Sequence, residues 1–280
     1  MSEFYRPDSI GQAVRVLSEK QPDIIAGGTD MMVRMRWGYR PAAVMDISGL
    51  DVLKGISING SDLVIGTMTK HAEIANNEVV KQHALAVFQA ARIIGSPQIR
   101  NMGTVGGNIA NASPAADLLP PLFALNARVE ILSVAGRRTL PISDLFTGPK
   151  QTVLRPDELI GWVRIPIESD VFSTYMRLGT RSSLSISKVG VALTAKIRKQ
   201  QGSTILNNCS ITLGSVAPTI IYAHSAMKIL ENRPLSQELV EKAARAASED
   251  ARPIDDIRST AEYRKSMVRI LTKRCLQAIE

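Results

Sequence analysis

Two glycine-rich segments dominate the sequence: residues 95–117, which read GSPQIRNMGTVGGNIANASPAAD, and residues 24–30, which read IIAGGTD. Glycine has no Cβ, so backbone N–H groups in such segments can approach an anion closely. Thr29, Thr104 and Asn108 add side-chain donors beside the glycines. Together the two segments predict a pyrophosphate-binding site, although each alone also fits an ordinary tight turn.

Neither segment is a standard nucleotide-binding fingerprint. No lysine follows Gly27-Gly28 as in a Walker loop, and the glycines from Gly103 to Gly107 are not spaced as in a Rossmann motif. Asp117 ends the run of small residues and could accept a hydrogen bond from a ribose, as acidic residues do in dinucleotide sites. The alternative for Asp117 is the N-cap of a helix.

Hydrophobic periodicity and turn residues outline the elements on both sides of these segments. A helix is expected from Ser9, which with Gln12 has the pattern of a capping box, and one long helical stretch is expected over residues 69–94. The other expected helices are 31–37, 223–232, 236–250 and 260–279. The expected strands are 24–26, 44–47, 55–58 with 63–66, 127–134 with 139–142, 159–165, and 188–198 with 203–214.

Composition excludes several classes of protein. The 280 residues are 45% hydrophobic and 21% charged, which is typical of a folded globular chain. No apolar run approaches the roughly 20 residues that cross a bilayer, and the first residues do not resemble a signal peptide, so a soluble, cytoplasmic protein is expected. The two cysteines, Cys209 and Cys275, and the three histidines are too scattered to predict a metal site.

The net charge of +8 is unevenly distributed. Residues 1–170 carry 17 basic and 17 acidic side chains, whereas residues 171–280 carry 17 basic and 9 acidic ones. Such an excess suits nucleic acid, an acidic partner protein or a phosphate-bearing ligand. Aromatic residues are only 4% of the chain, which disfavours a single-strand stacking surface, so no nucleic acid is expected.

The order of the motifs closely resembles that of the FAD-binding medium subunit of the molybdenum hydroxylases, which include xanthine dehydrogenases and aerobic carbon monoxide dehydrogenases. The resemblance rests on AGGTD at residues 26–30, on GSPQIRNMGTVGGNI at residues 95–109, and on Ser113, Pro114, Asp117 and Pro120. The segment PIDDIRSTAEYR at residues 253–264 extends it into the last part of the chain.

This resemblance implies an α+β fold with two parts. Residues 1–170 would form an FAD-binding domain of the vanillyl-alcohol-oxidase (PCMH-like) type, with subdomains 1–55 and 56–170. Residues 171–280 would form a C-terminal α+β domain of antiparallel sheet and helices. FAD would lie between the two subdomains.

The resemblance also assigns roles to residues. Residues 24–31 would run along the FAD diphosphate and the adjoining ring, and Asp117 would bind ribose. The backbone of Leu159 and Ile160 would lie near the adenine, Lys188 would reach the isoalloxazine, and Ile94 would replace an aromatic residue of a relative. The full set is Ile24, Ile25, Ala26, Gly27, Gly28, Thr29, Asp30, Met31, Ile94, Thr104, Gly106, Gly107, Asn108, Ala110, Asp117, Leu159, Ile160 and Lys188, with no catalytic residue and no metal ligand.

In this family a large subunit carries molybdopterin and a small subunit carries two 2Fe-2S clusters, so the chain is expected to pass electrons through FAD to NAD⁺ or another acceptor. The AGGTD motif is similar to that of xanthine-dehydrogenase-type subunits, which favours a purine or another N-heterocycle as substrate of the complex. The alternatives are a carbon monoxide or aldehyde dehydrogenase of the same family, a free-standing flavin oxidase, and a non-enzymatic basic interaction module. Quinone, ferredoxin and oxygen remain open as acceptors.

Overall fold

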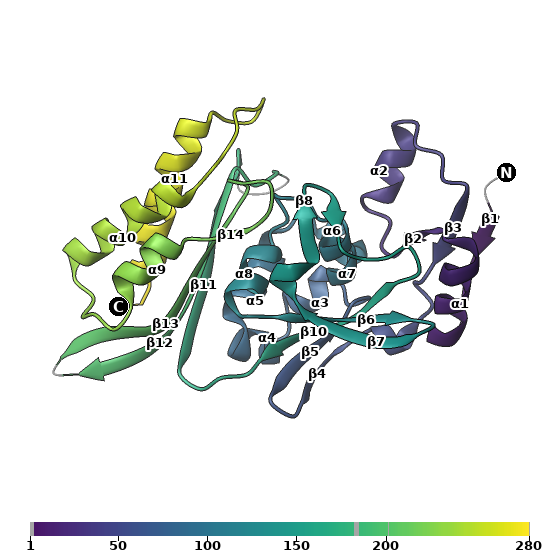
Figure 1. Cartoon of the computed structure of the whole chain (residues 1–280), viewed down its shortest axis with the longest axis horizontal. Helices are drawn as coiled ribbons and strands as arrows, with labels where there is room; N and C mark the ends of the chain where they lie inside the picture. The colour runs from purple at the N-terminus through teal and green to yellow at the C-terminus, as the bar shows by residue number, and fades with distance from the viewer. Residues whose placement is uncertain (1–2, 182–184, 201, 280) are drawn as a thin grey trace.

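The computed structural model describes residues 3–181, 185–200 and 202–279. The chain runs through three parts, from the purple N-terminal part through a central part to the green and yellow C-terminal part (Figure 1). None of the helices in the described part of the chain is long and apolar enough to span a bilayer. The cytoplasmic location stays a prediction.

The N-terminal part contains a small parallel sheet. Its strands β1 (Glu3–Tyr5), β3 (Ala43–Asp46) and β2 (Asp23–Ile25) lie in that order. Helix α1 (Ile10–Lys20) begins where the Ser9 hydroxyl accepts from the Gln12 N–H, and it buries Ala13, Val14 and Leu17. The Gln12 side chain accepts from the N–H of Asp8 rather than that of Ser9, so the predicted capping box is shifted by one residue.

The central part contains a five-stranded antiparallel sheet in the order β4-β5-β10-β6-β7. Its strands are β4 (Ile56–Asn59), β5 (Asp62–Gly66), β6 (Arg128–Ser133), β7 (Gly136–Pro141) and β10 (Leu159–Pro166). Both hairpins predicted from the sequence are present. In the first, Gly60 has φ +61°, a conformation that glycine adopts without a steric penalty.

The expected single helical stretch over residues 69–94 is wrong. The structure has three helices there, α3 (His71–Ile74), α4 (Glu78–His83) and α5 (Leu85–Ile93). Asn77 caps a new helix, because its side chain accepts from the Val80 N–H. Ala84 has φ −147°, which is not helical, so the helix is interrupted between α4 and α5. An apolar period continues across these breaks because all three helices bury residues against the same core.

Three short helices follow at the glycine-rich segment. They are α6 (Pro97–Met102), α7 (Val105–Ala110) and α8 (Leu119–Ala124). Ser96 caps α6 with proline at the first turn, and Thr104 caps α7. Gly95, with φ +50°, separates α5 from α6, so Pro97 starts a new helix beyond the glycine. The remaining short elements are η1 (Asp51–Leu53), α2 (Met31–Arg36), η2 (Ile142–Leu145), β8 (Phe146–Gly148) and β9 (Gln151–Thr152).

The C-terminal part is an antiparallel sheet covered by helices. Strands β11 (Val171–Leu178), β12 (Val189–Gln200), β13 (Ser203–Gly214) and β14 (Ile221–Tyr222) pair in sequence order. Helices α9 (His224–Leu230), α10 (Gln237–Asp250) and α11 (Ala261–Gln277) pack on one face and confirm the three expected helices. The sequence pattern does not predict strand β11. The expected strands 188–198 and 203–214 are joined through residue 201, which lies outside the described residues.

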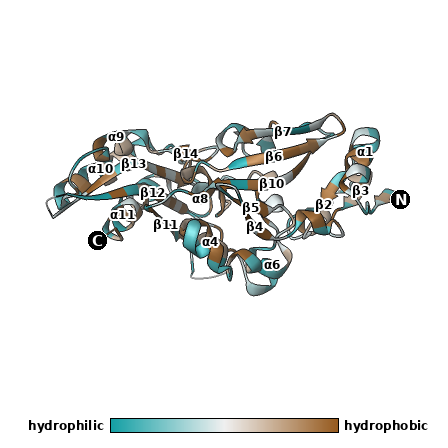
Figure 2. Ribbon diagram, turned by 90° about the horizontal axis from the view of Figure 1, so that it is seen from below, coloured by the Kyte–Doolittle hydropathy of each residue, from teal (hydrophilic) through white to brown (hydrophobic). Residues whose placement is uncertain are grey.

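The central and C-terminal parts share a core. The central hydrophobic cluster, formed by β5, β6, β10, α5 and α8, also contains Tyr175, Ala192 and Ile220. The hydrophobic residues gather along these inner strands, whereas α4 on the outside is largely hydrophilic (Figure 2). The Thr212 hydroxyl donates to the Pro120 carbonyl at 2.7 Å, and the Thr194 hydroxyl to the Ala124 carbonyl at 2.8 Å. The division at residue 170 therefore stays a prediction about domains, and packing continues across it.

Candidate functional site

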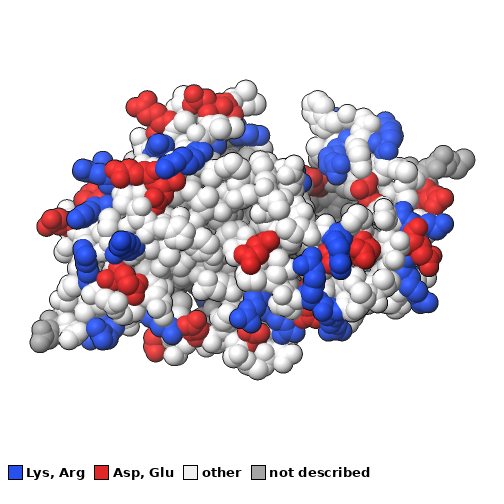
Figure 3. All heavy atoms as spheres, in the orientation of Figure 1, with Lys and Arg blue, Asp and Glu red and all other residues white. Residues whose placement is uncertain are grey.

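A cleft of about 850 Å³ lies where the three parts of the chain meet. Figure 3 shows this face of the molecule hollowed between the part around α2 and the part around α11. One side, which we term the glycine side, comprises residues 24–30, 94–117 and 149–150. The other, which we term the arginine side, comprises residues 185–187, 215–218 and 252–264. Residues from both sides line the cleft.

The two glycine-rich segments contact each other. A Cβ added at Gly27 would overlap the Met102 carbonyl oxygen and lie 2.6 Å from its carbon. Nothing larger than glycine fits there, because the obstacle is backbone that cannot move aside. Gly27 therefore joins the first segment to the end of α6 and brings both segments to one cleft.

Glycine has a separate physical reason at each of the other positions in these segments. Gly28 has φ +72°, which strains any residue with a side chain, and a Cβ at Gly106 would lie 2.6 Å from the Thr67 Cβ. Gly107 is exposed, and its Cβ would meet only the Thr104 hydroxyl, at 3.2 Å. Of these glycines, Gly107 is the one whose missing side chain leaves space on the surface.

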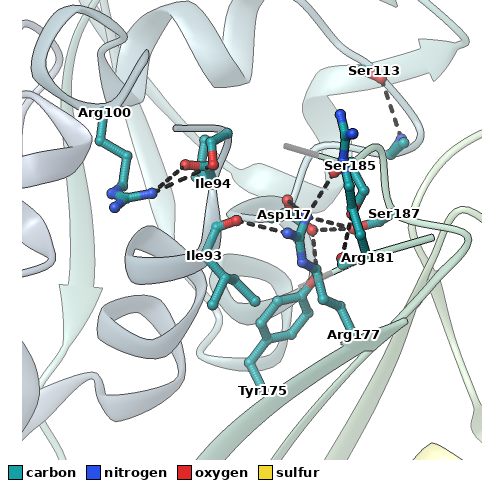
Figure 4. Close-up of polar contacts among 12 residues, drawn as sticks. Ile93, Ile94, Arg100, Ser113, Asp117, Tyr175, Arg177, Arg181, Ser185 and Ser187 are labelled. Carbon is teal, nitrogen blue, oxygen red and sulfur yellow. Dashed lines mark hydrogen bonds and ion pairs between the residues drawn. The ribbon is translucent and has the colours of Figure 1, made fainter. Parts of the chain in front are cut away.

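Asp117 is the centre of a buried polar network, drawn in Figure 4. Its Oδ1 accepts from the Tyr175 hydroxyl at 2.8 Å and from the Ser187 hydroxyl at 2.5 Å. Its Oδ2 accepts from Arg177 Nη1 at 2.9 Å. The helix-cap alternative is wrong, since Leu118 occupies the N-cap position of α8 and no side chain caps that helix.

The network leaves room for a ligand at Asp117. Burial raises the pKa of Asp117, and the Arg177 guanidinium and the three hydrogen bonds oppose that rise. Arg177 also donates from Nη2 to the Ile93 carbonyl at 2.7 Å, which ties β11 to the end of α5. Each carboxylate oxygen can accept two hydrogen bonds, and Oδ2 has one protein donor. Oδ2 can therefore accept one more hydrogen bond, and Asp117 is one of the residues that line the cleft.

Three buried polar atoms of cleft-lining residues have no hydrogen-bond partner among the described residues. They are Asn108 Oδ1 on the glycine side, and Ser215 Oγ and Arg264 Nε on the arginine side. A buried polar atom without a partner is costly, and a bound water or ligand is one way to satisfy it. Here an acceptor, a hydroxyl and a donor belong to residues that line one cleft, and this chemistry fits a ligand rich in hydroxyl and phosphate oxygens, such as FAD.

The arginine side is held by an ion-pair cluster around Asp256. Arg264 Nη2 donates to Asp256 Oδ1 at 2.7 Å, and Arg264 Nη1 donates to the Ser215 carbonyl at 2.8 Å. Burial favours the neutral acid, but the Arg258 N–H and the Arg264 guanidinium outweigh it and hold the pKa of Asp256 at about 2. The carboxylate is therefore ionised at neutral pH and fixes both arginines.

The predicted site residues fall into three groups. Asp30, Ile94, Asn108 and Asp117 line the cleft. Thr104 and Gly106 are used in packing, since the Thr104 hydroxyl accepts from the Gly107 N–H and Gly106 fits against Thr67. The remaining residues do not line the cleft, and their cofactor contacts stay predictions: Ile24, Ile25, Ala26, Gly27, Gly28, Thr29, Met31, Gly107, Ala110, Leu159, Ile160 and Lys188.

Leu159, Ile160 and Lys188 contact other parts of the protein, and their expected cofactor contacts stay predictions. Leu159 and Ile160 are buried at the start of β10 in two hydrophobic clusters, and the Ile160 carbonyl accepts from the Thr67 hydroxyl. Lys188 Nζ lies 5.7 Å from the centroid of the Tyr263 ring. It therefore lies beside the start of α11.

The sequence does not point to several residues in or beside the cleft. Arg177, which donates to Asp117, belongs to β11, a strand that the sequence pattern does not predict. Lys150 follows Gly148-Pro149, a turn signal that could have placed it in a loop. No sequence signal distinguishes Ser185 and Ser187, because serines are common in polar segments.

Two families match the chain. Residues 1–168 match the family described as FAD binding domain in molybdopterin dehydrogenase, and residues 174–279 match the CO dehydrogenase flavoprotein C-terminal domain. The matches cover both the glycine side and the arginine side of the cleft.

Relatives of known activity match over almost their whole length. The nicotine 6-hydroxylase medium subunit of Paenarthrobacter nicotinovorans is 34% identical, over 98% of this chain and 95% of the relative. The carbon monoxide dehydrogenase medium chain of Hydrogenophaga pseudoflava is 30% identical, over 99% of this chain and 96% of the relative. The solved carbon monoxide dehydrogenase of the same organism contains a chain that superposes with a TM-score of 0.93 at 31% identity, covering 99% of this chain and 96% of that one. The expected fold class is confirmed.

Proposed function

Because the chain belongs to the family of FAD-binding medium subunits of the molybdenum hydroxylases, we propose that it passes electrons within such an enzyme to NAD⁺ or another acceptor. The electrons would come from 2Fe-2S clusters on a small partner subunit, and a large partner subunit would oxidise the substrate at molybdopterin. The chain itself is an FAD-containing oxidoreductase subunit. FAD, when bound, accepts electrons singly and releases them in pairs.

The single structural observation that supports cofactor binding is that three residues lining one cleft each carry a buried polar atom with no hydrogen-bond partner among the described residues. Asn108 would accept from a hydroxyl of FAD, and Asp117 Oδ2 would accept from a ribose hydroxyl through its free position. Ser215 and Arg264 would donate to polar atoms at the other end. In this arrangement the protein binds and orients the cofactor, and no side chain is required to move a proton.

We propose an N-heterocycle, such as a purine, as the substrate class of the complex. The AGGTD motif at residues 26–30 supports it, and so does the similarity to the nicotine 6-hydroxylase subunit, whose name states an N-heterocyclic substrate. Carbon monoxide or an aldehyde is the second candidate, supported by the match to the carbon monoxide dehydrogenase medium chain.

The test is to purify the chain with the proteins that accompany it and to record its visible spectrum. Flavin bands together with iron-sulfur absorption and molybdenum are expected. Anaerobic addition of hypoxanthine, nicotine or carbon monoxide should then bleach the flavin for one substrate class. A colourless chain would contradict the flavoprotein function, and bleaching of the isolated chain by a substrate would instead support a self-sufficient oxidase.

A further inference from the structure

The residues predicted to surround the FAD diphosphate contain no cation. Residues 24–31, Thr104, Gly107 and Asn108 are neutral apart from Asp30, which is acidic. A diphosphate carries negative charge that either N–H donors or a cation must balance. A cation on the glycine side of the cleft is therefore a feature that the predicted site lacks.

Lys150 is a cation on that side. It lies in the turn between β8 and β9 and lines the cleft with Asp30, Asn108 and Asn111. Its backbone has φ +62°, which is uncommon for a residue with a side chain, and its N–H donates to the Ala112 carbonyl at 2.8 Å. The turn therefore holds the lysine against residues 108–112, beside α7.

The ammonium of Lys150 is only partly compensated by the protein. Nζ donates to Asn111 Oδ1 at 2.6 Å, and the nearest carboxylate oxygen, Asp30 Oδ2, lies 3.9 Å away, beyond hydrogen-bond distance. An ammonium group has three donors, so two remain for other acceptors. Burial lowers the pKa of Lys150, Asp30 opposes this, and Arg34 adds to the lowering.

The arginines that line the cleft are engaged elsewhere. Arg258 and Arg264 pair with Asp256 at 3.1 and 2.7 Å, and Arg252 donates to the Ala251 and Glu249 carbonyls. All three belong to the arginine side. Among the described lining residues, Lys150 is thus the cation placed on the glycine side, between the first glycine segment and α7.

We propose that Lys150 binds a phosphate group of the FAD diphosphate and so links the first glycine segment to the segment around Asn108. This inference rests on the proposed function, because it assumes that FAD is the ligand. Asn111 and Asp30 orient the ammonium, and a phosphate oxygen accepts one of its two remaining donors. The ammonium thereby balances part of the diphosphate's negative charge, where the other predicted residues offer only neutral donors.

The experiment compares FAD with riboflavin, which has the isoalloxazine but no phosphate, by equilibrium dialysis against the full chain. Lys150→Met is expected to weaken FAD binding about 10- to 100-fold, as for loss of a charge-assisted hydrogen bond. Riboflavin binding should change less than about twofold. Lys199→Met, at an exposed lysine of β12, is the matched control and should change neither.

A second measurement needs no substitution. FAD affinity of the unaltered chain should fall as pH rises through the pKa of Lys150, because the neutral amine loses its attraction for phosphate, and riboflavin affinity should not. Lys150→Arg should retain most of the FAD affinity.

Unchanged FAD affinity in Lys150→Met, or equal weakening of FAD and riboflavin, would overturn the proposal while leaving the flavoprotein function intact. Failure of the unaltered chain to bind FAD at all would instead overturn the proposed function.

Discussion

The two sides of the cleft are held by different interactions. On the glycine side, backbone contacts backbone, as at Gly27 and Met102, and charges are few. On the arginine side, Asp256, Arg258 and Arg264 hold one another through ion pairs and hydrogen bonds. The difference teaches that steric changes should damage the first side where backbone meets backbone, and that charge changes should act wherever a carboxylate pairs with arginine, at Asp117 on the first side and at Asp256 on the second. Four predictions test this comparison.

The largest effect is expected from Gly27→Val. The added side chain would overlap the Met102 carbonyl, so the two glycine segments must separate, and the free energy of unfolding should fall by about 3 kcal/mol or more. Urea titration followed by circular dichroism measures it. Gly11→Ala is the control, because nothing lies within 4 Å of its added Cβ and alanine favours the helix. A stable Gly27→Val chain would show that the segments do not depend on this contact.

The next effect is expected from Arg177→Met, which removes the cation that joins Asp117 to β11. A buried carboxylate without its partner should lower the free energy of unfolding by about 3 kcal/mol at neutral pH. Since burial already raises the pKa of Asp117, the variant's carboxyl becomes neutral at a higher pH still, and protonation removes the buried charge. The difference in free energy of unfolding between the variant and the unaltered chain should therefore become smaller as pH falls. A loss independent of pH would assign Arg177 a packing role only.

Gly107→Val tests the glycine side at a position with open space. The chain should keep its free energy of unfolding within about 1 kcal/mol, because Gly107 is exposed and an added Cβ meets only the Thr104 hydroxyl. FAD affinity should fall about 100-fold if the diphosphate occupies that space. Dialysis against FAD and a urea titration of the same sample separate the two readouts, and unchanged affinity would remove Gly107 from the predicted site.

The smallest effect is expected from Asp256→Asn on the arginine side. The low pKa of Asp256 means that its ionised form stabilises the folded chain above the ordinary carboxyl pKa and loses that effect as pH falls through about 2. The variant should be less stable by about 1 to 2 kcal/mol at neutral pH, and the difference should vanish near pH 2. Urea midpoints of both chains across pH measure it. An equal difference at every pH would contradict the ion-pair account.

Local signals predicted much of the fold. The β4–β5 and β6–β7 hairpins, strands β12 and β13 and the three C-terminal helices follow from alternation, turn residues and helical periodicity. Local signals did not predict the helix interruption at Ala84, because the apolar period continues through it. They did not predict strand β11 either, because β11 pairs with β12 in a register that only the sheet defines.

The sequence by itself determined the family and the order of the two glycine segments. The structure adds the reason for glycine at Gly28, whose φ is +72°. Only the tertiary structure decided that Gly27 lies on the Met102 backbone, that Asp117 meets Arg177, and that Lys150 stands beside Asn111. The physical reason is that these partners are brought together by packing of the three parts. Local propensity and spacing carry no information about such distances.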